Sequence, residues 1–373
     1  MKRTTLSLGF LAWLAILMIL PGSGVARTSC DAGAAICAWT QRVVGIKTPN
    51  MIASGTLIGD GFVLTNRHVV EDHGSVLIRL PDGEITRAQP IPHDVPVDLV
   101  LLRLRGTDNP LPRRDDAVPG HSPILTVVGF DQGRNQPRAY EPSTFARHPD
   151  ATVLPQARIH ADARALPGNS GGAVLNAAGE LVGILAAGDG EMSEIIPIQH
   201  LSALLARSGS AHEQAFLQQG GAIRRCADLL YEAGSIARDP SADLVMALKT
   251  ACLTSGNKML FDQAGQKFGE WWMFQLSEMF LRESLKLDPD SPNSLMSLAV
   301  TYHLDRQMEK ERPLLERYLD IDPQNPQALR LAVQVAGVLK DRLLADRVLA
   351  LMEAHNPAAL PLAREFIANA FAS

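Results

Sequence analysis

The chain has 373 residues and a formal net charge of −5, and this length is more than one modest domain needs. A mildly acidic chain without basic clusters does not fit a nucleic-acid-binding protein, because such proteins neutralise phosphates with clustered Lys and Arg. Length and charge therefore favour a protein of more than one domain whose partners are not nucleic acids.

The first 26 residues have the pattern of a secretory signal peptide. Lys2 and Arg3 precede an apolar run over residues 6–20, and small residues follow up to Ala26. Cleavage after Ala26 removes two bases and no acid, which changes the net charge from −5 to −7. The alternative is a membrane anchor, but the run is shorter than the about 20 apolar residues that span a bilayer. We expect a mature chain without a membrane anchor, located in the periplasm or secreted.

All the cysteines follow this predicted cut: Cys30, Cys37, Cys226 and Cys252. An even number of cysteines in an exported chain suggests disulfides, and the local pairings Cys30–Cys37 and Cys226–Cys252 are the simplest of the three connectivities. Free thiols are the alternative. The sequence has no clustered Cys and His spacing of the kind that binds structural zinc, so we expect no metal site.

Residues 43–206 have the texture of short strands, with apolar runs interrupted by Gly, Pro and Asp. His68 ends one such run, after a glycine turn at residues 59–61. Imidazole suits proton transfer near neutral pH, which makes this residue a candidate general base. Asp98 stands at the head of the apolar run 97–102. Burial of a carboxylate there is costly unless it accepts a hydrogen bond from an imidazole N–H, so this residue is the candidate orienting acid.

Ser170 lies within the stretch Gly168-Asn169-Ser170-Gly171-Gly172. Glycines on both sides of a serine allow a tight turn on which a substrate carbonyl can approach the backbone closely. The same composition is also that of an ordinary turn. The presence of a candidate base and a candidate acid upstream favours the interpretation of Ser170 as a nucleophile.

The chain order His, Asp, Ser is that of the chymotrypsin-type arrangement. Residues 54–70, 97–102 and 167–184 resemble the HtrA/Deg branch of the trypsin-like serine proteases. The resemblance implies a chymotrypsin-like double β-barrel that hydrolyses peptide bonds of protein or peptide substrates through an acyl-enzyme. It implies His68, Asp98 and Ser170 as the catalytic triad, with the N–H groups of Gly168 and Ser170 as the oxyanion hole. This chemistry requires no cofactor.

Competing residues lie near the candidate base and acid. His73 and His93 do not end strand-like runs, and we expect both to be surface histidines. Asp94 lies outside the apolar run that positions the candidate acid. These placements favour His68 and Asp98.

The substrate side-chain pocket is less well defined by the sequence. Arg164 stands six residues before Ser170, where trypsin-like enzymes place the floor of the S1 pocket, and Ala165 follows it. The wall is predicted to be Leu185, Ala186 and Ala187. An arginine at the floor selects acidic P1 residues. The alternative is a rebuilt loop in which Arg164 points to solvent and the pocket prefers small aliphatic side chains, and we favour this second interpretation.

Beyond residue 207, the sequence pattern changes from strand-like to helix-like. Residues 208–221 are small and polar enough to form a linker, and residues 222–373 read as helices. Prolines recur at positions 289, 323 and 357, a spacing of 34 residues. This is the repeat length of the tetratricopeptide (TPR) motif. We predict a TPR-like solenoid in which residues 222–253 form a leading hairpin and residues 361–371 a capping helix.

The TPR pattern predicts which helical residues are buried between neighbouring hairpins. Glu311 and Tyr318 depart from it, because the motif usually has small residues at these positions. Asp262, Met296 and Arg330 are predicted to line the concave groove. The predicted buried positions are Phe261, Gly265, Phe268, Leu281, Leu295, Leu298, Ala299, Tyr302, Leu315, Leu329, Ala332, Ala345 and Leu349.

The predicted organisation is a signal peptide (1–26), a trypsin-like serine protease domain (27–207), a linker (208–221) and a helical TPR-like domain (222–373). The leading hypothesis is an exported serine endopeptidase in envelope protein quality control or processing, with a protein partner bound by the TPR region. The alternative is a poorly active or latent protease domain that serves as a TPR interaction or chaperone scaffold. The sequence does not define the oligomeric state.

Overall fold

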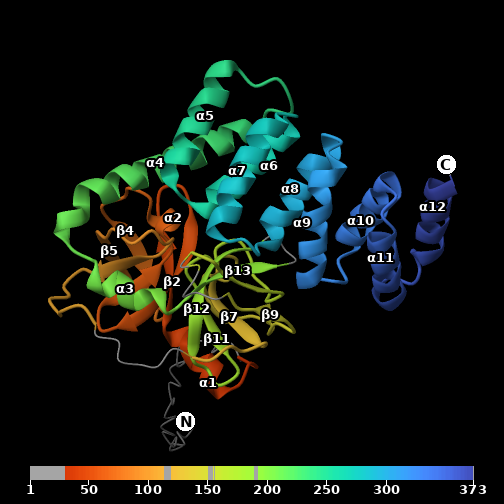
Figure 1. Ribbon diagram of the computed structural model, residues 1–373. Coiled ribbons are helices and arrows are strands. Elements are labelled where there is room, and N and C mark those ends of the chain that lie inside the picture. The colour runs from red at the N-terminus through yellow and green to blue at the C-terminus, as the bar shows by residue number, and fades with distance from the viewer. Residues whose placement is uncertain (1–29, 113–118, 150–153, 155, 189–191, 373) are drawn as a thin grey trace, which may run out of the picture.

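The computed structural model describes residues 30–112, 119–149, 154, 156–188 and 192–372. Two β-sheet units form the N-terminal half, and a row of helices follows them in the chain. Figure 1 shows the helices lying along one side of the sheets, with the last ones farthest from them. The predicted signal peptide, residues 1–26, lies outside the described residues.

The first unit is a closed six-stranded antiparallel barrel, in which strands meet in the order β1-β2-β3-β6-β5-β4. Its interior is filled by side chains such as Val63, Ile78 and Leu102, none of which is exposed. The strands are β1 (Val43–Lys47), β2 (Ile52–Gly59), β3 (Phe62–Thr65), β4 (Val76–Arg79), β5 (Ile85–Ile91) and β6 (Val100–Leu104).

The second unit is a seven-stranded antiparallel sheet in the order β8-β7-β11-β12-β13-β10-β9. A separate apolar cluster joins the two units. It includes Leu64 and Leu101 from the barrel and Val128 and Ile184 from the sheet. The fold class predicted for this half, two β-barrel-like sheets of the chymotrypsin type, is confirmed. The strands are β7 (Leu125–Asp131), β8 (Gln136–Ala139), β9 (Ala146–Arg147), β10 (Ile159–Ala161), β11 (Ala173–Asn176), β12 (Leu181–Gly188) and β13 (Ser193–Pro197).

Short helices connect and cap these sheets. One turn of helix, α2 (Arg67–Val70), follows β3 directly. The others are α1 (Ala34–Cys37), α3 (His200–Ala206) and 3-10 turns at Ala38–Gln41 and Ser210–His212.

The long helices are arranged as hairpins. Helices α6, α8 and α10 begin at Lys258, Pro292 and Pro326, so that each starts 34 residues after the one before. The helices are α4 (Glu213–Gly234), α5 (Ala242–Ser255), α6 (Lys258–Glu270), α7 (Phe274–Leu287), α8 (Pro292–Leu304), α9 (Met308–Ile321), α10 (Pro326–Leu339), α11 (Arg342–His355) and α12 (Leu360–Ala372).

The residues that cap the starts of these helices recur with the same 34-residue spacing. The side chains of Asn257, Ser291 and Asn325 each accept a hydrogen bond from a backbone N–H in the first turn of the helix that follows. Such N-caps satisfy donors that have no partner within the helix, and proline at the first helical position adds a fixed φ. The helical half is thus a solenoid with a 34-residue repeat, as the proline spacing predicts.

The buried face of the solenoid agrees with the repeat pattern. Of the large side chains predicted to be buried between hairpins, Leu349 is only half-buried and the others are buried. The two departures from the motif are also buried: Tyr318 is 4% exposed and Glu311 is fully buried. Glu311 is accommodated by His303, whose Nδ1 lies 3.1 Å from both carboxylate oxygens.

Both predicted disulfides are present, Cys30–Cys37 and Cys226–Cys252. The second joins α4 to α5 and closes the leading hairpin that the sequence predicts. The prediction of a linker over residues 208–221 is wrong from Glu213 onward, because these residues form the start of α4. The small residues that suggest a linker have a packing role instead: a Cβ at Gly220 would lie 2.3 Å from the carbonyl oxygen of Glu71.

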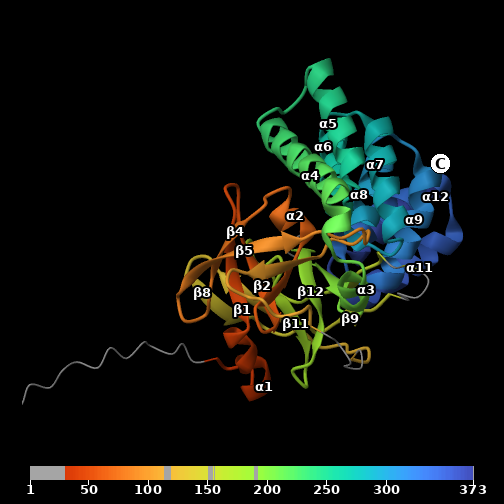
Figure 2. The same ribbon diagram turned by 90° about the vertical axis from the view of Figure 1, so that its left-hand side faces the viewer.

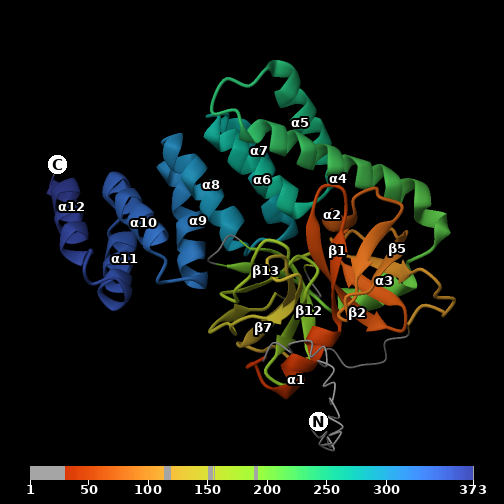
Figure 3. The same ribbon diagram turned by 180° about the vertical axis from the view of Figure 1, so that it is seen from behind.

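Helix α4 packs on the N-terminal β half at α2. The Arg67 guanidinium lies 3.7 Å from the Phe216 ring centroid and donates to the Phe216 carbonyl at 2.6 Å. The Phe216 side chain joins the apolar cluster of the barrel. Figure 2 shows α4 lying above α2, β4 and β5. Figure 3 shows α8 to α12 continuing away from the sheets.

Candidate active site

His68 and Asp98 lie against each other between α2 and the start of β6. The Asp98 carboxylate accepts two hydrogen bonds from the same residue, one from the His68 backbone N–H to Oδ1 at 2.9 Å and one from Nδ1 to Oδ2 at 2.7 Å. The Asp98 carbonyl in turn accepts from the Asn66 side chain and the Arg67 N–H, both at 3.2 Å. The one-turn helix after β3 therefore fixes the imidazole relative to the carboxylate.

The Asp98 side chain is 5% exposed, and so is the imidazole of His68. Burial by itself raises the pKa of a carboxyl group. For Asp98, the charge and hydrogen bond of His68, with Arg158 as a further positive charge, outweigh burial and lower its pKa below the ordinary value. The carboxylate is thus ionised at neutral pH and holds Nδ1 of the imidazole as a donor. In that tautomer, Nε2 is free to accept a proton.

Ser170 lies in a turn held by both β units. From β2, the Ser54 hydroxyl donates to the Gly168 carbonyl at 2.7 Å, and the Ser54 N–H donates to the Ser170 carbonyl at 2.8 Å. Buried Asn169 anchors the same turn, since its Oδ1 accepts from the Leu166 N–H at 2.7 Å. The loop is therefore fixed on both sides of the serine.

The backbone around Ser170 leaves two donors available. In the hydrogen bonds of the described residues, the N–H groups of Gly168 and Ser170 donate to no protein acceptor. Gly168 has φ +97°, a conformation that side chains disfavour, and a Cβ there would lie 2.4 Å from Nε2 of Gln132. Two free N–H groups on one turn are the kind of donors that an oxyanion hole requires.

The hydroxyl of Ser170 is hydrogen-bonded to a backbone carbonyl. Its Oγ donates to the carbonyl of Ala186 at 3.0 Å, and among the described residues it makes no hydrogen bond to His68. Ala186 is the bulged residue of β12, where the register with β13 shifts between Leu185 and Ala187. The bulge aims its carbonyl at the serine. The hydroxyl proton must leave this carbonyl before the base can take it.

The competing residues lie elsewhere. Asp94 is exposed and pairs with Arg207 at 2.8 Å, and His73 is half-buried with Nε2 3.4 Å from Glu71. The prediction of a surface position for His93 is wrong. This imidazole packs edge-on against the Phe216 ring, and burial lowers its pKa to about 4. The sequence could not indicate this, because α4, which covers His93, belongs to the helical half.

The predicted pocket residues divide by exposure. Arg164 is exposed, Ala165 and Ala187 are half-buried, and Leu185 and Ala186 are buried. An exposed guanidinium does not form the floor of a pocket.

Within the described ranges, no group of three or more His, Cys, Asp or Glu side chains could hold a metal ion. No helix in the same ranges is both long enough and apolar enough to cross a membrane.

Three charged residues near Asp98 were not predicted from the sequence. Arg158 precedes β10, Glu194 lies in β13 and Lys258 begins α6. All three are buried. Nothing in their local sequence distinguishes them from surface charges, because their burial depends on the docking of the helices.

Residues 53–184 match the trypsin-like peptidase domain family. The chain carries a trypsin-like peptidase domain. The domain is similar to serine endoprotease DegS of Haemophilus influenzae, with 30% identity over 139 residues, which is 36% of this chain and 41% of the relative. It is also similar to a probable periplasmic DegP-like serine endoprotease of Pseudomonas fluorescens, with 36% identity over 140 residues, 36% of this chain and 28% of the relative.

Solved structures with a similar arrangement include a serine endoprotease from Yersinia pestis, with a TM-score of 0.40 and 22% identity, covering 48% of this chain and 67% of that one. Another is the Rv3671c protease of M. tuberculosis in an inactive form, with a TM-score of 0.38 and 22% identity, covering 46% of this chain and 91% of that one. The peptidase domain of this chain thus spans less than half the length of the curated relatives that it matches.

Proposed function

We propose that the protein is an exported serine endopeptidase that cleaves peptide bonds with His68, Asp98 and Ser170. The observation that carries the proposal is the pair of hydrogen bonds, 2.7 and 2.9 Å long, by which Asp98 holds His68. These bonds leave Nε2 of the imidazole as a base, in a domain whose Ser170 turn also carries two free backbone donors.

In the proposed mechanism, Nε2 of His68 removes the hydroxyl proton as Ser170 Oγ attacks the substrate carbonyl. Asp98 stabilises the imidazolium that forms, and the N–H groups of Gly168 and Ser170 bind the oxyanion. Each such donor typically contributes ~3 kcal/mol in the transition state. The imidazolium then protonates the leaving amine, and water hydrolyses the acyl-enzyme with His68 again as base.

The proposed substrates are extended polypeptides with small aliphatic P1 residues. The exposed position of Arg164 supports this preference over acidic P1 residues. Beyond Ile184, where its pairing with β11 ends, β12 pairs with β13 on one side through Leu185, Ala187 and Gly188. Its other side can hydrogen-bond a substrate backbone as an added strand.

We place the enzyme in the periplasm or outside the cell, in protein quality control or processing. The signal-like residues 1–26, the two disulfides and a relative named as a periplasmic endoprotease support this location. The solenoid with its 34-residue repeat supports a TPR-like role in binding a protein partner. The proposed domain limits are 27–207 for the peptidase and 222–373 for the repeats, with α4 extending the helical part toward the peptidase.

A latent protease is the second candidate, and it rests on the hydroxyl of Ser170. This group donates to the Ala186 carbonyl at 3.0 Å, which is the state of a serine that is not engaged by its base. In this reading, the folded protein serves as a repeat scaffold until the side chain turns toward His68.

Labelling of the purified protein with a fluorophosphonate probe tests both candidates. The active-enzyme proposal expects labelling of the full chain and none in Ser170→Ala. The matched control is Ser122→Ala, because this serine bonds locally to the Ile124 carbonyl in an exposed turn and lies outside the site. Absence of labelling in the full chain between pH 6 and 9 contradicts the active-enzyme proposal and favours the latent scaffold.

A further inference from the structure

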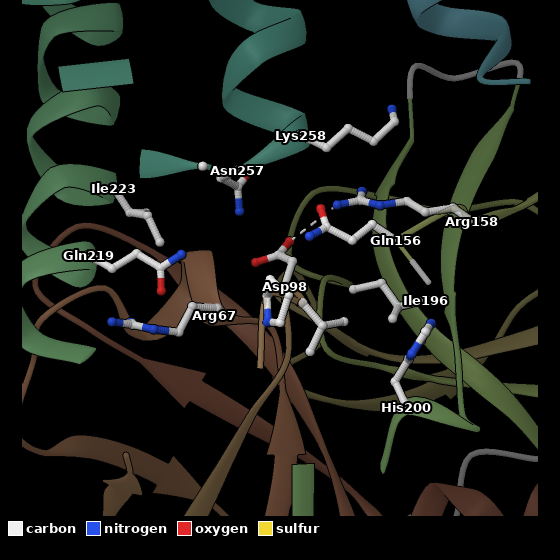
Figure 4. Close-up of a pocket in the computed structure, with 13 residues that line it drawn as sticks. Arg67, Asp98, Gln156, Arg158, Ile196, His200, Gln219, Ile223, Asn257 and Lys258 are labelled. Atoms are coloured by element: carbon white, nitrogen blue, oxygen red, sulfur yellow. Dashed lines mark ion pairs between the residues drawn. The ribbon is translucent and has the colours of Figure 1, made fainter. Parts of the chain in front are cut away.

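A buried arginine forms an ion pair with the candidate acid. Nη2 of Arg158 lies 3.6 Å from Asp98 Oδ2, the same oxygen that receives Nδ1 of His68. Nη1 of the arginine binds Glu194 Oε2 at 2.7 Å. The Arg158 side chain is 4% exposed. Figure 4 shows its guanidinium directed at the Asp98 carboxylate. Both residues line a small cavity of about 30 Å³.

The contact continues into the helical half. The other oxygen of Glu194, Oε1, accepts a hydrogen bond from Nζ of Lys258 at 2.7 Å. Lys258 is the first residue of α6, and its ammonium also binds Asp262 at 2.9 Å and the Ser291 hydroxyl at 3.0 Å. An unbroken series of alternating charges thus runs from the candidate triad to the first repeat. It comprises Asp98, Arg158, Glu194, Lys258 and Asp262, which we call the charge chain.

Every member of the charge chain is buried, at 9% exposure or less. A buried charge without a partner costs several kcal/mol, so each member depends on its neighbours. Burial alone lowers the pKa of Arg158, but Glu194 and Asp98 outweigh it and raise that pKa. Burial raises the pKa of Glu194, but Lys258 and Arg158 outweigh it and lower that pKa. Both groups remain charged, which makes the chain an electrostatic link.

A second buried contact keeps the two halves together beside this link. His160 of β10 lies 2.8 Å from Asp288, at the end of α7, and both side chains are 2% exposed. Lys258 therefore reaches Glu194 across a fixed interface between sheet and helices.

Arg158 and His68 compete for one carboxylate oxygen. A positive charge near Asp98 keeps the carboxylate ionised and in place, but it also disfavours the protonated imidazole that shares the same oxygen. The charge of Arg158 therefore favours the neutral imidazole, which is the form that acts as a base. Glu194 has the opposite effect on the imidazole, and Lys258 offsets Glu194.

We propose that Arg158 is a positioning residue for the triad, held by Glu194 and Lys258, so that the first helical repeat sets the pH range in which His68 acts as base. This inference rests on the proposed function. It makes the solenoid part of the support of the active site, in addition to any partner that it binds.

The sign of the charge that is removed predicts the direction in which the pH–labelling profile moves. Removing a positive charge, in Arg158→Met or Lys258→Met, should move the acid limb of the pH–labelling profile to higher pH. Removing a negative charge, in Glu194→Gln, should move it to lower pH. Coulomb interaction at an effective dielectric constant of about 20 predicts a shift on the order of one pH unit for Arg158 and a smaller shift for Lys258, which is two contacts farther from the imidazole.

Other charged groups face the same site and stay unchanged in these variants. The shifts are therefore compared among variants of one background. These groups are Arg67, Glu71, Asp72, His160, Asp262 and Asp288.

The experiment measures fluorophosphonate labelling rates of the full chain from pH 5 to 9, and the titration midpoint of the His68 imidazole by NMR in the same variants. The control is Lys267→Met, because this lysine lies on the same helix and pairs with Glu270 outside the charge chain. The double variant Glu194→Gln/Lys258→Met removes one charge of each sign, and its midpoint should lie between those of the two single variants. It also replaces a buried ion pair as a unit, which preserves folding better than removal of one partner.

Shifts of opposite sign for the two kinds of variant, with none in Lys267→Met, support the proposal. Midpoints that stay within 0.2 pH units of the wild type, or that all move in one direction, overturn it. A protein that is labelled at Ser170 and has unmoved midpoints refutes the role of Arg158 but retains the proposed function. A protein that is not labelled, but whose imidazole shifts by charge sign, retains the electrostatic link and refutes the peptidase activity.

Discussion

Asp98→Asn is the substitution that most directly tests the candidate triad. The two carboxylate oxygens of Asp98 accept from two donors, the His68 N–H at 2.9 Å and its Nδ1 at 2.7 Å. An asparagine amide has one oxygen and one NH₂ group, so it can satisfy only one of these donors as an acceptor. With its oxygen on the backbone N–H, the NH₂ group faces Nδ1 and requires the tautomer that carries its proton on Nε2.

That tautomer cannot take a proton from Ser170. The expected loss in labelling rate is about 10⁴-fold, which corresponds to about 5.5 kcal/mol of transition-state stabilisation. The assay is the second-order rate of fluorophosphonate labelling at pH 8, with circular dichroism and thermal unfolding to show that the variant folds.

Asp94→Asn is the matched control. Asp94 is four residues away, and it is exposed and paired with Arg207, so its labelling rate should stay within about threefold of the wild type because surface ion pairs contribute little. The reasoning is refuted if folded Asp98→Asn labels within tenfold of the wild type, or if Asp94→Asn loses as much as Asp98→Asn.

Three further predictions concern the oxyanion turn and the solenoid. Gly168→Ala, at φ +97°, should lower the labelling rate about 10²-fold through a displaced N–H, and it should also lower the melting temperature because of the strained backbone; an unchanged rate in the folded variant would contradict the assignment of the oxyanion hole. Burial raises the pKa of Glu311 from 4.5 to about 8, so the folded protein binds this proton more tightly than the unfolded chain, and the free energy of unfolding falls as pH rises through that range. Glu311→Gln should weaken this pH dependence in urea unfolding at pH 5 and pH 8, and an equal dependence in both proteins would refute it. Replacing Cys226 and Cys252 by serine opens a loop of 26 residues and should cost about 3.5 kcal/mol of unfolding free energy in the same assay. A loss below about 1 kcal/mol would argue against stabilisation of the leading hairpin by this disulfide.

The sequence predicts the features of this protein that depend on local patterns. The glycine turn before β3 and the apolar run 97–102 indicate where His68 and Asp98 lie along the chain, and the structure brings these two side chains into contact. The 34-residue recurrence predicts the starts of α6, α8 and α10, since each repeat carries its own N-cap. Cysteines close in sequence predict both disulfides because short loops are the simplest to close.

Local sequence patterns do not predict the contacts between the β half and the helical half. The small residues before Ala222 suggest a linker, but they belong to α4, where the absence of a side chain at Gly220 allows close packing against Glu71. Asp262 is predicted to line the groove of the solenoid, and that prediction is wrong, because the residue is 2% exposed and bound to Lys258. In both cases the residue type is compatible with solvent, and only the partner brought by the fold decides its environment.

The same reasoning explains why the charge chain has no signature in the sequence. Arg158, Glu194 and Lys258 come from segments 36 and 64 residues apart, and each alone has the composition of a surface position. Burial of one of them without the others costs several kcal/mol, whereas burial of all together satisfies each charge. The environment of Arg158 is therefore set jointly by the sheet and by α6, and a property of the peptidase site, the charge beside Asp98, depends on a helix that the peptidase fold does not contain.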